Sequence, residues 1–287
     1  MAWHARLALH YERQREAPSG PGSAALPRTV AHFHHEGPLR ILQSLYPEGP
    51  GICHNVLVHP PSGLVAGDRL DIAVQVAAGA HGLVTTPGAT RFYRSEGELA
   101  VQEARLTLAE DARLEWLPME ALYYSGCQAE NRLQMQLAPG AQVMGWDVTA
   151  LGLPAAGQPF VAGRLQQHLE LEGVWLERGR IDATDARLMD GPLGLAGHRC
   201  MATLFLASGS DLTREAREEA LTLARDLIEA HPLRAQAGAT SPHPRVVVLR
   251  VLAPVVEPAM ELLKAVRNAW RPALWGLAPN PPRTWAL

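Results

Sequence analysis

Apolar and polar residues alternate with a period of two through the first two-thirds of the chain, and this alternation repeats together with its turns. Three turns of similar sequence occupy residues 77–80, 109–112 and 138–141, so the repeat lengths are 32 (77 to 109) and 29 residues (109 to 138). A period of two is typical of a half-buried β-strand. Repeats of this length indicate stacked coils or meandering hairpins that bury one continuous core.

Apolar residues at matching positions precede each turn when the three units are aligned. A weaker fourth unit covers residues 169–181. The hairpins of an ordinary sandwich would show the same alternation, so that architecture stays open as an alternative at this point. The matched positions are Ile72, Ala104 and Leu133, then Val74, Leu106 and Met135, and then Val76, Leu108 and Leu137.

The last third of the chain changes to mixed helix and strand patterns. Thr213 can cap a helix that continues to Ala230. Residues 245–252 predict a buried strand, and residues 258–270 predict a second helix that Pro272 ends. This part of the chain is therefore expected to be α+β with two helices.

Two segments rich in proline and glycine predict connections, at residues 16–28 and 237–244. We expect a stacked-strand body over residues 1–207 and a helix–strand–helix region over residues 208–287. The second region is expected to pack on the first, so that the two form one structural domain.

The composition excludes several classes of protein. Apolar residues make up 47% of the chain and charged residues 19%, which is too apolar for a disordered protein. The 26 basic and 29 acidic side chains give a net charge of −3, so neither nucleic acid nor a membrane surface is an expected partner. No apolar run reaches the roughly 18 residues that span a bilayer.

Familiar catalytic motifs are missing from the sequence. It contains one lysine, Lys264, and none of the GxSxG, HExxH, GxGxxG or GxxxxGK patterns. The three cysteines, Cys53, Cys127 and Cys200, are too far apart for a disulfide framework and fit a reducing compartment. The N-terminus lacks the order of a signal peptide, so we expect a cytoplasmic protein.

Polar residues gather at one edge of the aligned repeats. If the units stack, Thr86, Glu120, Asp147 and Thr149 lie near one another, where their oxygens could hold water or a hard cation. A solvated rim of turn ends is the alternative. Because paired catalytic carboxylates need no fixed sequence spacing, a stacked-strand carbohydrate hydrolase or lyase using Glu115, Glu120 and Asp147 is an alternative function.

His32 and His34 lie two residues apart, so on a strand both side chains would share one face and could bind a divalent metal. Two ligands make a weak site, and a histidine-rich strand in contact with water is the alternative. A free-standing metal-binding module centred on His32, His34 and His35 is a third functional class.

Residues 54–70, with the sequence HNVLVHPPSGLVAGDRL, carry a specific pattern. The further blocks that belong with it, the last three of them weaker, are residues 79–81, 85–95, 114–118, 37–40, 45–49 and 282–285. Together these blocks resemble the UreD (UreH) family of urease accessory proteins. The resemblance extends over nearly the whole chain.

The resemblance implies a scaffold of helically stacked strands with two helices, in agreement with the repeats. The expected fold class is therefore mainly β, with β-helix-like stacked strands and an α+β C-terminal part. The resemblance further implies a urease maturation factor without enzymatic activity. Such a factor would bind UreF, reach the GTPase UreG through UreF, dock on apo-urease and help to deliver nickel, with no tightly bound cofactor.

The resemblance also implies an internal passage for nickel, whose ligands must bind the ion weakly enough to release it. Carboxylates and hydroxyls suit this role, because histidine and cysteine hold nickel more tightly. The family motifs carry Asp68, Thr90 and Glu120 as candidates for nickel transit. Asp147 and Glu177 are added from the edge argument, with a structural salt bridge as the alternative for each.

Three tryptophans, Trp270, Trp275 and Trp285, lie within the last 18 residues (270 to 287). The prolines of this tail prevent it from continuing the preceding helix, so the rings must pack on this chain or on a partner. Tryptophan and arginine are enriched at interface hot spots. Trp270, Trp275, Arg283 and Trp285 are therefore candidate partner-binding residues, and docking on this chain is the alternative.

Overall fold

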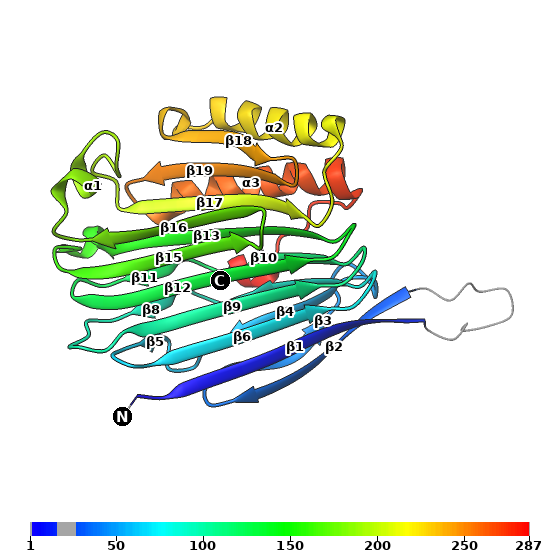
Figure 1. Cartoon of the computed structure of the whole chain (residues 1–287), viewed down its shortest axis with the longest axis horizontal. Coiled ribbons are helices and arrows are strands. Elements are labelled where there is room, and N and C mark those ends of the chain that lie inside the picture. The colour runs from blue at the N-terminus through cyan, green and yellow to red at the C-terminus, as the bar shows by residue number, and fades with distance from the viewer. Residues whose placement is uncertain (1, 16–26, 287) are drawn as a thin grey trace, which may run out of the picture.

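Two β-sheets, one in front of the other, form the body of the protein (Figure 1). The computed structural model describes residues 2–15 and 27–286. Within these residues, sheet A has seven strands in the order β16-β15-β12-β9-β6-β1-β2. They are β1 His4–Arg15, β2 Pro27–Glu36, β6 Arg69–Val76, β9 Ala100–Leu108, β12 Cys127–Leu137, β15 Gly163–Leu171 and β16 Trp175–Asp182.

Sheet B has twelve strands in the described residues, and eight of them follow the path β18-β19-β17-β13-β10-β7-β4-β3. These eight are β3 Arg40–Leu45, β4 Cys53–Val58, β7 His81–Thr85, β10 Arg113–Leu117, β13 Gln142–Leu153, β17 Cys200–Ser208, β18 Ala237–His243 and β19 Val246–Ala253. The short strands beside this path are β5 Gly63–Leu64, β8 Thr90–Phe92, β11 Ala121–Tyr123 and β14 Gln158–Pro159.

Helices α2 (Arg214–Glu229) and α3 (Val256–Trp275) cover the outer face of sheet B (Figure 1). Thr213 Oγ1 accepts a hydrogen bond from the backbone N–H of Ala216 at 3.1 Å, which confirms the predicted helix start. The remaining helical elements of the described residues are α1 Ala186–Asp190 and three 3-10 turns at Pro154–Ala156, Arg234–Gln236 and Arg283–Ala286.

The chain winds between the two sheets in parallel coils. Strands β6, β9 and β12 are parallel neighbours in sheet A, and Ala104 lies beside both Ile72 and Leu133. The alignment of the repeats in the sequence therefore matches the pairing of residues in sheet A. The predicted stacking of strands is confirmed. The fourth unit differs, because β15 is parallel to β12 whereas β16 runs back antiparallel to β15.

The repeated turns share one conformation, with a left-handed residue at the third position of each. Gly79, Asp111 and Gly140 occupy this position with φ angles of +64°, +55° and +74°. Glycine adopts this conformation without strain, and aspartate is among the residues that tolerate it. The N–H of Gly79 donates to the carbonyl of Glu110 at 3.0 Å, and the N–H of Asp111 to that of Pro139 at 3.2 Å, so successive turns are also joined.

Two apolar layers hold the elements together. One lies between the sheets and includes Tyr11, Phe92 and Phe205. The other lies between sheet B and the helices and includes Trp146 and Trp270. Strands of sheet B are therefore buried on both faces, which explains their continuous apolar runs. None of the helices in the described residues combines the length and apolar character needed to cross a membrane.

The segment at residues 237–244 was expected to be a connection, and the structure corrects this prediction. Most of it forms β18, which pairs antiparallel with β19 at the edge of sheet B. An edge strand tolerates Pro242, because one side of it needs no ladder hydrogen bonds. The carbonyl of Ala239 accepts a hydrogen bond from Arg225 Nη2 of α2 at 3.1 Å.

The other predicted connection, at residues 16–28, lies mostly outside the described residues, and its last two residues begin β2. Strand β17 contains residues 207 and 208, so sheet B crosses the division expected between body and C-terminal region. The predicted strand at residues 245–252 is confirmed as β19.

Helix α3 extends beyond both of its predicted ends, and Pro272 lies inside it. The proline removes one backbone donor, but the turn that follows is anchored by Trp275, whose Nε1 donates to Gln142 Oε1 at 2.5 Å. Gly276 then ends the helix in the left-handed conformation, with φ of +65°. Side-chain anchoring therefore outweighs the proline as a stop signal.

The C-terminal tail docks on this chain. Trp285 Nε1 donates to Thr85 Oγ1 at 3.0 Å, and the Trp285 ring lies 5.2 Å from that of Trp146. Lys264 Nζ is 5.2 Å from the centre of the Trp285 ring. The backbone carbonyl of Asn280 accepts a hydrogen bond from Arg267 Nη1 at 2.9 Å. These contacts match the alternative in which the tail belongs to the fold.

Changing Trp285 to alanine is expected to lower the free energy of unfolding by about 2 kcal/mol, because a partly buried ring and its hydrogen bond are lost. Denaturant unfolding followed by circular dichroism measures this effect. Leu193→Ala is the control, since Leu193 is fully exposed. Equal midpoints for the two variants would show that the docked tail adds nothing to stability.

Candidate functional site

A ladder of amide side chains lies between the two sheets. Gln102, Asn131 and Gln167 are register neighbours on β9, β12 and β15. Ala104 and Leu133, two positions further along, belong to the core between the sheets. Because side chains alternate across a strand, the three amides face the same interior. Neighbouring strands lie about 4.8 Å apart, so the amides follow one another closely.

Hydrogen bonds connect this ladder to sheet B. Thr90 Oγ1 on β8 donates to Gln102 Oε1 at 3.3 Å, and Gln102 Nε2 donates to Asn131 Oδ1 at 3.3 Å. Asn131 Nδ2 then donates to Asp147 Oδ2 on β13 at 2.9 Å. A continuous run of hydrogen-bonded side chains therefore leads from Thr90 on sheet B, across two amides of sheet A, to the carboxyl group of Asp147 on sheet B.

Neutral donors surround the Asp147 carboxyl group. Its Oδ1 accepts hydrogen bonds from Gln167 Nε2 and from Thr149 Oγ1, the latter at 3.4 Å. Burial raises the pKa of Asp147 to about 6, although these hydrogen bonds oppose the rise. With a pKa of about 6, the carboxyl group loses its proton between roughly pH 5 and pH 7 and is mostly ionised at neutral pH. We call Thr90, Gln102, Asn131, Asp147, Thr149 and Gln167 the polar layer.

A cavity of about 180 Å³ meets the polar layer at Thr90 and Gln102. Thr86 lines it from sheet B, and Leu70 and Ile72 line it from sheet A. A space of this size accommodates several water molecules. At this end of the layer there is therefore space for the water ligands that an ion would exchange for protein oxygens.

Thr90 and Asp147 are the predicted transit residues that join the polar layer, whereas Asp68 lies elsewhere. Asp68 is buried in the turn before β6. Its Oδ1 accepts a hydrogen bond from the N–H of Trp3 at 3.1 Å, and its Oδ2 accepts one from the N–H of Val65 at 2.9 Å. Both oxygens thus fix the backbone of the turn and of the N-terminal segment.

Glu120 does not join Asp147, contrary to the alignment of the repeats. The register partner of Thr149 is Ala121, so the loop before β11 adds one position. A shift of one residue sends a strand side chain to the opposite face. Glu120 instead lines a separate hollow of about 260 Å³ beside Cys200.

Glu177 forms a salt bridge between the sheets, as its structural alternative stated. Arg250 Nε on β19 donates to Glu177 Oε2 on β16 at 3.3 Å. Trp175 Nε1 donates to Glu177 Oε1 at 3.1 Å. With both oxygens paired, this carboxylate joins β16 to β19 and lies outside the polar layer.

Glu115 lies under α3, on the face of sheet B opposite to Asp147. Its Oε2 accepts a hydrogen bond from Arg267 Nε at 2.7 Å, and its Oε1 is 3.4 Å from Arg271 Nε. All three of these charged side chains are fully buried. Glu115, Glu120 and Asp147 thus face different surroundings, and the carboxylate pair required by a hydrolase is not formed by them.

Of the four candidate partner-binding residues, Trp270 and Trp275 are buried in this chain. Trp270 Nε1 donates to the backbone carbonyl of Ala220 in α2 at 2.9 Å. Arg283 is exposed and Trp285 is partly exposed. A partner could therefore reach Arg283 and Trp285 directly, whereas the other two rings serve the core.

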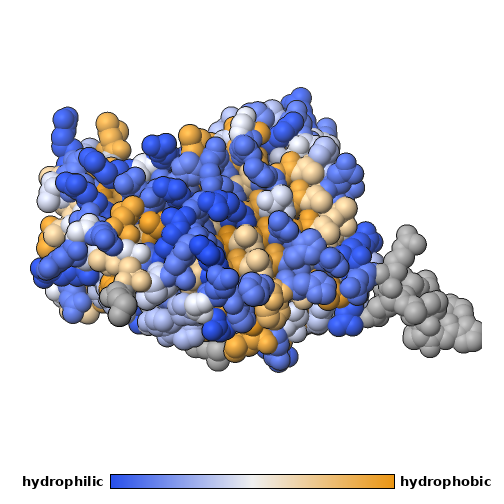
Figure 2. Space-filling model, turned by 60° about the horizontal axis from the view of Figure 1, so that its bottom comes forward, coloured by the Kyte–Doolittle hydropathy of each residue, from blue (hydrophilic) through white to orange (hydrophobic). Residues whose placement is uncertain are grey.

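His32 and His34 lie on the outer face of sheet A, on edge strand β2. The face turned forward in Figure 2 is hydrophilic over most of its area. His32 Nε2 is 3.6 Å from Glu12 Oε2, whereas His34 Nε2 is 3.9 Å from Glu36 Oε1. The two imidazoles therefore have different partners and do not converge on one position.

The amides Gln102, Asn131 and Gln167 are the residues of the site that the sequence analysis missed. A signal for them existed, because Gln102 and Asn131 stand two positions before the aligned apolar residues Ala104 and Leu133. A polar residue at an inward position of a repeat must find a partner inside the protein. That rule singles out the ladder without a structure.

These features define a class of protein: a stacked-strand scaffold that carries a polar layer within its apolar interior. The described candidates do not form a facing pair of catalytic carboxylates. A family model described as UreD urease accessory protein matches residues 4–286. The chain is 67% identical over 287 residues to the urease accessory protein UreD of Paracidovorax citrulli. It is 63% identical over 286 residues to that of Variovorax paradoxus, and both matches cover 100% of each chain.

The chain therefore belongs to the UreD family of urease accessory proteins. Its role is that of an accessory protein in urease maturation and not that of an enzyme.

Proposed function

We propose that this chain joins UreF and, through UreF, the GTPase UreG, docks on apo-urease and passes nickel through the polar layer. Family membership supports the role in maturation. The observation that carries the nickel route is the hydrogen-bonded run from Thr90 to Asp147. In this proposal GTP hydrolysis belongs to UreG, which is consistent with the absence of a GxxxxGK pattern from the sequence of this chain.

The chemistry of the layer suits an ion that must move on. Amide and hydroxyl oxygens bind a hydrated dication weakly, and histidine or thiolate ligands would hold nickel more tightly. Asn131 and Gln167 can turn their amide groups to offer oxygen in place of nitrogen. Asp147 supplies one negative charge, since a pKa of about 6 leaves it mostly ionised at neutral pH.

A cytoplasmic location is part of the same proposal. Cys53, Cys127 and Cys200 are free and buried. Burial raises the pKa of Cys127 and of Cys200 to about 12, so both thiols stay protonated and poorly reactive. Three unpaired cysteines fit a reducing compartment.

The chain and UreF are expected to elute as one complex in size-exclusion chromatography at micromolar concentration. UreG is expected to join this complex only when UreF is present, because the chain reaches UreG through UreF. A mixture of the chain with UreG alone is the control. Separate elution of the chain and UreF at several salt concentrations would contradict the proposed assembly.

A further inference from the structure

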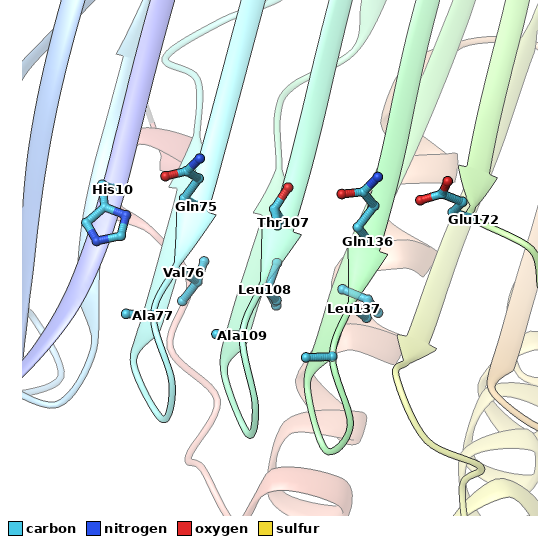
Figure 3. Close-up of a pocket in the computed structure, with 11 residues that line it drawn as sticks. His10, Gln75, Val76, Ala77, Thr107, Leu108, Ala109, Gln136, Leu137 and Glu172 are labelled. Atoms are coloured by element: carbon cyan, nitrogen blue, oxygen red, sulfur yellow. The ribbon is translucent and has the colours of Figure 1, made fainter.

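Two histidines on neighbouring strands share one carboxylate on the outer face of sheet A. His10 on β1 lies directly opposite His32 on β2, and Glu12 follows two residues along β1 on the same face. His10 Nε2 is 3.3 Å from Glu12 Oε1, and His32 Nε2 is 3.6 Å from Glu12 Oε2. Figure 3 shows His10 at the end of an outward row that continues with Gln75 on β6.

We propose that His10, Glu12 and His32 form a surface site for a transition-metal dication such as Ni²⁺ or Zn²⁺. Two imidazoles and one carboxylate are a donor set that such ions bind, with water in the remaining positions. The Cβ atoms of directly opposite residues lie about 4.5–5.5 Å apart, so both imidazoles can reach one ion. The site is separate from the polar layer and does not depend on its function.

The site is open to solvent. Within the part of the chain that is described, no three His, Cys, Asp or Glu side chains already surround a common metal position. The three donors must therefore turn toward one another. The side chains of His10, Glu12 and His32 are 39%, 46% and 58% exposed, so staggered rotamers are accessible to each without disturbing the core.

The orientation of His10 leaves one ring nitrogen for an ion. Its Nδ1 is buried without a hydrogen-bond partner among the described residues. Its Nε2 faces Glu12 at the surface, where water and ions have access. A dication at Nε2 would separate this nitrogen from Glu12 Oε1 and be bound by both, and the carboxylate would offset part of its charge.

The neighbouring histidines lack such an arrangement. His34 lies opposite Ala8, so no second imidazole faces it across the strands. His35 lies opposite Leu7 and points to the other face of the sheet. The pair suggested by the sequence, His32 with His34, is thus replaced by a pair across two strands, and His34 becomes a matched control.

Isothermal titration of the full chain with NiCl₂ tests the site. His10→Ala and His32→Ala are each expected to weaken one nickel-binding event by about tenfold or more, since loss of even an indirect partner of a ligand costs that much. The double variant H10A/H32A is expected to lose one equivalent of bound nickel. His34→Ala is expected to bind like the unchanged chain.

Two outcomes would overturn the site: unchanged nickel binding by H10A/H32A, or an equal loss of binding in His34→Ala. Circular dichroism confirms that each variant is folded, which is expected because the substituted side chains lie at the surface. Urease activation is not the readout, so this test stands apart from the proposed nickel route. Asp147→Asn is expected to retain the surface binding event.

Discussion

Changing Glu115 to alanine is expected to lower the free energy of unfolding by about 3–5 kcal/mol, because it leaves buried arginines without their counter-charge. Arg267 and Arg271 are both fully buried against Glu115. Glu48 still pairs with Arg271, at 2.6 Å, so Arg267 suffers most. Denaturant unfolding followed by circular dichroism measures the loss.

Glu218→Ala is the control for this change, because Glu218 pairs with Arg214 on the exposed surface of α2. Exposed pairs of this kind add little to stability. Glu115→Gln keeps the shape of the side chain and is expected to lose less than Glu115→Ala. A Glu115→Ala protein as stable as the Glu218→Ala protein would contradict the role of the buried ion cluster.

Changing Asp147 to asparagine is expected to lower urease activation by about tenfold or more while it stabilises the protein above pH 6. Two unit charges 4 Å apart interact with an energy of about 4 kcal/mol at an effective dielectric constant of 20. The loss of the Asp147 charge near a cation therefore exceeds the free energy of a tenfold change in binding. Activation is measured as urease specific activity after co-expression with the other maturation proteins.

The stability of the Asp147 variant follows from the sign of its pKa shift. The pKa of Asp147 in the fold, about 6, lies above its ordinary value of 3.8, so the folded state holds the proton more tightly. The contribution of Asp147 to the free energy of unfolding is fully present below pH 3.8 and is lost as the pH rises through 6. Asparagine cannot ionise, so the variant is expected to gain up to roughly 3 kcal/mol over the unchanged protein at pH 8.

Melting temperatures at pH 5 and pH 8 test this pH dependence. Glu172→Gln is the control, because it removes an exposed carboxylate from the outer face of sheet A (Figure 3). Its activation and melting temperature are expected to match those of the unchanged chain. An Asp147→Asn protein that activates urease fully, or that melts earlier at pH 8, would contradict the function assigned to this carboxylate.

Local patterns predicted the coils because strand period and turn chemistry are properties of short segments. The turn positions of Gly79, Asp111 and Gly140 set the register, and the parallel neighbours Ile72 and Ala104 follow from it. The capped start of α2 was predictable for the same reason. These elements need no knowledge of what packs against them.

The remaining features depend on residues far apart in the sequence. Glu115 meets an arginine 152 positions away, and Glu177 meets one 73 positions away, so no local pattern announces either pair. Strand β18 exists because β19 offers it a partner, despite Pro242. Glu120 was misplaced because one extra residue before β11 reverses the face of its side chain.

Whether nickel passes between the sheets is tested most directly with a variant of this chain whose interior is apolar. The quantity measured is the nickel content of urease that has matured with this variant. The double variant Asn131→Leu, Gln167→Leu replaces two amides of the polar layer with apolar side chains. Leucine fits these positions, because Leu70 already occupies the same register position on β6. The variant is co-expressed with urease and the other maturation proteins, and co-elution with UreF and circular dichroism confirm that it is intact.

Nickel per urease active site is then measured by elemental analysis of the purified enzyme. Passage through the polar layer predicts that the nickel content falls by about tenfold or more, because an apolar interior cannot replace the water ligands of a dication. Urease with its full nickel content, from cells in which the leucine variant still binds UreF, would contradict this route.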